Sequence, residues 1–215
     1  PYRLSEAAAD VSQATDGGDF DYPRARAGGL DAAFMSIYTP AGLEAEGRSR
    51  EEADQLIDLV VDIALASDGT FAIATSPGEV RENFEKGVMS LPLGMENGSP
   101  LDGDLANLRH FHERGIRYIT LAHSQSNHLS DSSYDETRQW NGLSEFGVEA
   151  VRDMTRLGIL VDVSHVSDAA FWGVLATSGV PVLASHSAAR HFSPEGARRV
   201  CVGVGVGVAG RGGRG

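Results

Sequence analysis

The sequence predicts an α/β fold, a TIM-like (β/α)8 barrel of the metal-dependent hydrolase type that is incomplete at both ends. Short apolar runs of strand length alternate with segments whose apolar residues recur at helical spacing, as in parallel α/β proteins. Three of the runs lead into potential metal ligands, Glu96, His165 and His186. Functional side chains of a barrel gather where its strands end, so this pattern indicates a metal site. With 215 residues, the chain is short of the roughly 250 of a complete barrel.

Strands and helices alternate in the first half of the chain. We expect a strand at residues 30–38, a helix at 53–64, a strand at 70–75, a helix at 77–86, a strand at 88–95 and a helix at 101–114. The first strand is mostly apolar, as is typical of a strand buried in a parallel sheet. Ser49 is placed to cap the first helix. Ser99 and Pro100 fit an N-cap followed by proline at the first position of the last helix.

The second half continues the alternation. We expect a strand at residues 116–122, a loop at 124–142, a helix at 144–157, a strand at 159–163, a helix at 167–178 and a strand at 181–184. The first of these strands delivers His123, and the polar loop after it is long enough to be functional. Ser144 opens the next helix and Gly158 ends it.

The composition changes abruptly after residue 200. Residues 1–200 are expected to form one barrel domain. Residues 201–215 contain seven glycines and neither helical period nor turn pattern, so we interpret them as a disordered or out-of-frame tail. The tail holds a GxGxxG pattern, but no helix and no acidic residue follow it, which disfavours a dinucleotide site.

Charge and cysteine content narrow the function classes. A formal net charge of −12 disfavours a nucleic-acid partner, because phosphate backbones are bound by surplus Lys and Arg. The single cysteine, Cys201, excludes an internal disulfide and a Cys-rich zinc module, so His and carboxylate remain as ligand types. No apolar run reaches the roughly 18 residues of a membrane span. The sequence does not indicate the cellular compartment of the protein.

Four stretches of the chain, in this order, resemble the membrane (renal) dipeptidase family of zinc peptidases. They are GMENGSPL (94–101), GIRYITLAHS (115–124), GLSEFGVEAVRDMTRLGILVDVSHVSD (142–168) and PVLASHSAARHFSP (181–194). The resemblance extends over residues 28–199. It implies a metal-dependent dipeptidase on a TIM-like barrel, in which one carboxylate bridges two zinc ions with a water or hydroxide between them.

The resemblance also implies roles for individual residues. Glu96 matches the bridging carboxylate, and His165 and His186 match the histidines of the second zinc. His123 matches the histidine that contacts the substrate near the scissile carbonyl, and is therefore the catalytic candidate. Arg198 matches the arginine that binds substrate, and a guanidinium would suit the free carboxylate of a dipeptide. Neutral imidazole and carboxylate are suitable zinc ligands.

Two parts of the family's site have no match in the sequence. The first zinc takes a His-x-Asp pair, and residues 1–4 resemble the segment just after it; the catalytic aspartate belongs to a strand that would follow residue 200. The chain is therefore expected to be a fragment that binds at most one zinc and hydrolyses little. Exposed sheet edges would favour self-association, with a homo-oligomer as one form of it.

Alternatives remain open at this point. Singly, a glutamate before Asn97 is typical of a turn, and each histidine could be an ordinary buried side chain. Asp162 could orient a ligand histidine or be a polar residue inside the barrel. The whole chain could be a catalytically silent metal-binding or scaffold relative. It could also be another amidohydrolase-type metal hydrolase that acts on a cyclic amide or ester.

Overall fold

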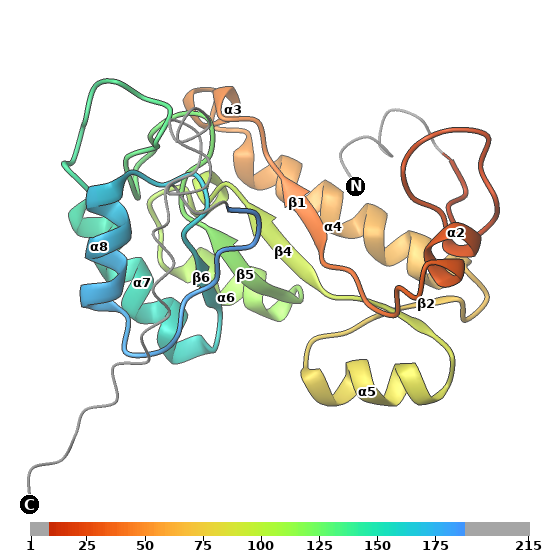
Figure 1. Cartoon of the computed structure of the whole chain (residues 1–215). Helices are drawn as coiled ribbons and strands as arrows, with labels where there is room; N and C mark the ends of the chain where they lie inside the picture. Colours follow the sequence, from red (N-terminus) through yellow and green to blue (C-terminus); the bar gives the residue numbers. More distant parts are fainter. Residues whose placement is uncertain (1–8, 188–215) are drawn as a thin grey trace, which may run out of the picture.

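The structure is a computed structural model that describes residues 9–187 (Figure 1). Its centre is a parallel sheet with the strand order β1-β4-β5-β6. These strands are β1 (Met35–Tyr38), β4 (Leu93–Glu96), β5 (Ile116–Thr120) and β6 (Leu160–Asp162). A parallel bridge between Asp162 and Leu183 continues the sheet beyond β6. The predicted parallel α/β fold is confirmed, and the described strands form part of a barrel wall with open edges.

A second, two-stranded parallel sheet joins β2 (Phe71–Ile73) to β3 (Met89–Leu91). The helices are α2 (Tyr22–Ala27), α3 (Gly42–Ala45), α4 (Ser49–Ala66), α5 (Pro77–Glu85), the 3-10 helix η1 (Ser99–Leu101), α6 (Ala106–Glu113), α7 (Glu145–Leu157) and α8 (Asp168–Thr177). Helix α4 packs on β1 and β2, α6 on β5 and α7 on β6, while α5, at the lower edge of Figure 1, packs on β3. Among the described helices, none is long and apolar enough to cross a membrane.

One row of paired strand residues makes the core beneath the helices. Ile37, Met95, Ile119 and Val161 stand side by side across the four strands, and all are buried in the apolar core. Successive side chains of a strand point to opposite faces of the sheet. The next row, Tyr38, Glu96, Thr120 and Asp162, therefore faces the inside of the barrel wall. A polar layer at the carboxyl ends of the strands follows directly from the register.

The predicted strand at residues 88–95 is divided into β3 and β4. Pro92 lies between them, and proline has no backbone N–H to donate to a neighbouring strand. The strand predicted at 181–184 is reduced to the single bridge at Leu183. These two predictions were correct in place and direction but too long.

The start of the helix predicted at residues 101–114 was wrong. Residues from Ser99 to Leu101 form η1, and α6 begins only at Ala106. Asp102 and Gly103 both have positive φ values, of 50° and 67°, which interrupts a right-handed helix.

The predicted cap at Ser49 was also wrong. Ser49 is the first helical residue of α4, and its hydroxyl accepts a hydrogen bond from the Ser99 hydroxyl at 3.1 Å. The caps of α7 were correct, since Ser144 accepts from the Gly147 N–H and Gly158 ends the helix in the left-handed region. Residues 201–215, the predicted tail, lie outside the described residues.

Candidate metal centre

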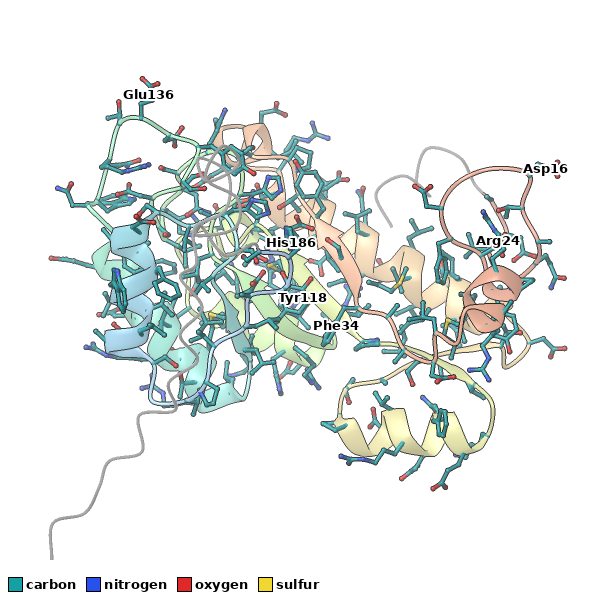
Figure 2. All side chains as sticks on the ribbon, viewed as in Figure 1. Asp16, Arg24, Phe34, Tyr118, Glu136 and His186 are labelled. Atoms are coloured by element: carbon teal, nitrogen blue, oxygen red, sulfur yellow. The ribbon has the colours of Figure 1, made fainter. Side chains whose placement is uncertain are left out.

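The strand ends bring four of the predicted site residues together. Glu96 is the last residue of β4, His123 follows β5, His165 follows β6, and His186 follows the bridge at Leu183. Figure 2 shows His186 on the inner side of the sheet, above Tyr118. The order of these ligands along the chain is the order of the strands in the sheet, as a parallel barrel requires.

Glu96 is the centre of the cluster. Its Oε1 lies 3.2 Å from Nε2 of His123, 3.3 Å from Nε2 of His186 and 3.6 Å from Nε2 of His165. The Nε2 atoms of His165 and His186 are 2.6 Å apart. Ligand atoms at 2.0–2.1 Å from a tetrahedral zinc stand about 3.3 Å from one another. The three distances from Glu96 and the nitrogen and oxygen donors therefore fit a small divalent cation such as zinc, whereas His165 and His186 lie closer together than two ligands of one tetrahedral ion.

Two side chains of this cluster, His165 and Glu96, are more buried than charged groups on a protein surface usually are. The side chain of His165 is 8% exposed and that of Glu96 18%. Burial alone would raise the pKa of Glu96, but hydrogen bonds from His123, His165, His186 and Ser36 hold this pKa well below its usual range. The protonated imidazole of His186 donates a hydrogen bond to Glu96, which raises the pKa of His186. The carboxylate is thus ionised and available as a ligand.

The loop at residues 124–142 fixes two of the histidines through their backbones. The N–H of Ser133 donates to the His165 carbonyl at 2.7 Å, and the hydroxyl of Ser132 donates to the His123 carbonyl at 2.6 Å. His165 has a φ of +66°, a left-handed conformation that such contacts must hold in place. The Tyr134 ring lies 5.7 Å from the His165 ring. This loop therefore shapes the site.

Some contributors to the site were missed by sequence reasoning. Ser36 on β1 donates its hydroxyl to Oε2 of Glu96 at 2.6 Å, and Ser185 contacts Nδ1 of His186 at 2.7 Å. The signal for Ser36 was a polar residue in an apolar strand, two positions before the strand's end. Arg198, the predicted substrate-binding arginine, lies outside the described residues.

A parallel α/β barrel wall with a buried carboxylate and three imidazoles at its strand ends is typical of metal-dependent barrel hydrolases. The family model described as membrane dipeptidase (Peptidase family M19) matches residues 1–198. The chain therefore belongs to the membrane dipeptidase family, as its sequence motifs indicated.

Two relatives that are named dipeptidases agree with this assignment. Dipeptidase aclJ of Aspergillus oryzae is 34% identical over 185 residues, which are 83% of this chain and 44% of that protein. Dipeptidase 3 of Mus musculus is 34% identical over 177 residues, 80% of this chain and 35% of that protein. The chain thus spans less than half the length of these two relatives.

Solved structures show the same fold. A metallopeptidase of Rhodobacter sphaeroides, liganded with a phosphinate mimic of the dipeptide L-Ala-D-Ala, superposes with a TM-score of 0.79 at 25% identity, over 88% of this chain and 63% of that one. The probable dipeptidase PvdM of Pseudomonas aeruginosa gives a TM-score of 0.75 at 28% identity, over 83% and 48%. The predicted TIM-like fold, present in part, is confirmed.

Proposed function

We propose that this chain carries part of a zinc-dependent dipeptidase centre, which hydrolyses the peptide bond of dipeptides. The observation that carries the proposal is that a single oxygen, Oε1 of Glu96, lies within 3.6 Å of Nε2 of three histidines. Glu96, His165 and His186 would hold one zinc ion in this chain. When bound, zinc polarises a carbonyl and lowers the pKa of a coordinated water to near neutrality.

His123 is proposed to act on the substrate. Its side chain is 20% exposed, so a substrate can reach it, and its ring packs edge-on against Tyr38 with ring centroids 4.8 Å apart. This contact fixes the plane of the imidazole. A donor held in this way beside the metal ligands would stabilise the negative charge that develops on the scissile carbonyl oxygen.

The substrate class is supported by the relatives. Several are named dipeptidases, and the Rhodobacter sphaeroides enzyme binds a mimic of L-Ala-D-Ala. Arg198 would pair with the terminal carboxylate that distinguishes a dipeptide from an internal peptide bond. Two zinc ions in the longer family members and self-association of this chain remain part of the proposal.

Hydrolysis of L-Ala-D-Ala and of a panel of L,L-dipeptides tests the function. The assay would use this chain and a chimera that adds the flanking segments of Dipeptidase aclJ outside the matched 185 residues. We expect zinc-dependent release of amino acids by the chimera, little by the chain itself, and none by the chimera with Glu96→Gln. A folded, zinc-loaded chimera that cleaves no dipeptide would favour a silent scaffold, and cleavage of cyclic amides instead would favour another amidohydrolase.

A further inference from the structure

We propose that Asp162, acting through the hydroxyl of Ser185, holds His186 in the tautomer whose Nε2 is free to bind a metal ion. The proposal rests on the proposed function, in which His186 is a zinc ligand. It makes Asp162 and Ser185 positioning residues of the metal centre.

Asp162 is a buried carboxylate surrounded by donors. It is fully buried at the end of β6. Its Oδ1 accepts from the N–H of Ser164 at 3.2 Å, the hydroxyl of Ser164 at 2.9 Å and the N–H of Ser185 at 2.9 Å. Its Oδ2 accepts from the hydroxyl of Thr120 at 2.6 Å and that of Ser185 at 2.7 Å. Five donors suit an ionised carboxylate, which can only accept.

The single proton of the Ser185 hydroxyl is therefore committed to Asp162. The Ser185 oxygen also lies 2.7 Å from Nδ1 of His186. Because that oxygen has no second proton, it can only accept, and Nδ1 of His186 must be the donor. A neutral imidazole carries one proton, so Nε2 of His186 is left with a free lone pair.

This lone pair points into the metal centre. Nε2 of His186 lies 2.6 Å from Nε2 of His165, from which it can accept a hydrogen bond, and 3.3 Å from Oε1 of Glu96. In the neutral Nδ1–H tautomer, neither this nitrogen nor Oε1 of Glu96 has a proton to donate to the other. Two electron-rich atoms at this distance repel each other unless a cation lies between them. The hydrogen-bonded chain thus prepares His186 as a ligand before any metal arrives.

The chain of hydrogen bonds is needed because packing does not fix the His186 ring. The His186 side chain is 46% exposed, against 8% for His165. Among the described residues, Nδ1 of His123 and Nδ1 of His165 are buried without a hydrogen-bond partner. Burial orients those two rings, whereas Ser185 orients His186.

Ser185→Ala is the sharpest variant, because Ser185 is exposed and the other contacts of the Asp162 carboxylate remain in place. Ser185→Thr retains a hydroxyl and should therefore keep the wild-type tautomer of His186. Ser187→Ala is the matched control, because among residues 9–187 the Ser187 hydroxyl contacts only that of Ser164, at 3.3 Å. Asp162→Asn gives a distinctive second test. The two N–H donors at Oδ1 require an oxygen there, so the amide NH2 would take the place of Oδ2.

That amide would donate to Ser185 and free the serine proton for Nδ1 of His186. The proton of the imidazole would then move to Nε2, the atom that should bind the metal. Tautomers are read by NMR on metal-free protein labelled with 15N-histidine, at about pH 9, well above the ordinary histidine pKa of about 6.5. Zinc affinity is read separately, by competition with a chromophoric chelator.

We expect the Nδ1–H tautomer of His186 in the wild type, the Ser185→Thr variant and the Ser187→Ala variant. Ser185→Ala should lose this preference and bind zinc about 10- to 100-fold more weakly, and Asp162→Asn should show the Nε2–H form. An unchanged tautomer and zinc affinity in Ser185→Ala would overturn the proposal. A wild type with the Nδ1–H tautomer that binds no zinc would instead overturn the proposed function and leave the hydrogen-bonded chain standing.

Discussion

Ser36 on β1 donates its hydroxyl to Oε2 of Glu96 at 2.6 Å, although the two residues are 60 positions apart in the sequence. This bond occupies one carboxylate oxygen and leaves the other to face the three histidines. The parallel pairing of β1 with β4 produces the contact, since Ser36 stands opposite Gly94, two residues before Glu96. Ser36, which was not among the predicted site residues, thus orients the carboxylate of Glu96.

Ser36→Ala should weaken zinc binding by about tenfold, because the unanchored carboxylate has more orientations to lose on binding. Ser90→Ala is the matched control, since Ser90 is also a serine in a strand but bonds to Asn83 away from the site. Chelator competition gives both affinities. Equal zinc affinity in Ser36→Ala and the wild type would show that this hydrogen bond does not orient Glu96.

Gly94→Ala should destabilise the fold. A Cβ at residue 94 would lie 2.0 Å from Cε1 of the Tyr118 ring, so the buried ring would have to move. We expect the free energy of unfolding to fall by about 1–3 kcal/mol, measured by urea denaturation. Gly179→Ala, where a Cβ meets nothing within 4 Å, should differ little from the wild type. Similar losses in both variants would contradict the close approach.

Asp21 should make stability depend on acid pH. The backbone N–H of Arg24 is the main cause that lowers the pKa of Asp21 from 3.8 to about 2, and hydrogen bonds from Thr15 add to it against the effect of burial. A pKa lower in the folded than in the unfolded chain stabilises the fold at higher pH. The contribution is complete above about pH 5 and is lost as the pH falls towards about 2.

The comparison of wild type with Asp21→Asn isolates this effect. Their difference in unfolding free energy should be constant above about pH 5 and shrink between about pH 4 and pH 2. Asp16→Asn, a change at an exposed acid, serves as the control for loss of a negative charge. A difference that stays constant down to pH 2 would show that Asp21 is not held ionised by these bonds.

Asp131 should hold the loop at residues 124–142 against the site. Its buried carboxylate accepts from the N–H groups of Gln139, Trp140 and Gly142 at 2.8, 3.1 and 2.9 Å. Asp131→Ala leaves these donors unpaired, so trypsin should cleave faster after Arg138, which is exposed in the same loop. Glu136→Ala, a change at an exposed acid of the same loop, is the control. Unchanged cleavage in Asp131→Ala would rule out this role.

Much of the fold could be predicted because local signals agreed with the tertiary structure. Helix α7 has a serine cap, a buried apolar stripe and a glycine at its end, and its bounds were predicted closely. The failures came where local signals conflicted with long-range contacts. Ser99 has the sequence signature of a cap, but its hydroxyl is bonded to Ser49, a residue 50 positions away.

The candidate site was predictable to a different degree at each residue. Glu96, His123, His165 and His186 stood out because each follows a strand-like run and matches a family motif. The sequence alone could not place Ser36 or Ser185 beside Glu96 and His186, because a serine in or after an apolar strand does not show which residue it contacts until the strand register is known. The choice between the two roles of Asp162 also depended on that register, which sets its side chain beside Ser185.

The central claim is that Glu96, with His165 and His186, binds zinc, and metal analysis after equilibrium dialysis tests it most directly. The wild type should retain one zinc ion per chain, as should His110→Ala, whose histidine pairs with Asp54 outside the site. Glu96→Gln, with its fold verified by circular dichroism, should retain none. Full zinc occupancy in Glu96→Gln, or no bound zinc in the folded wild type, would contradict the assignment.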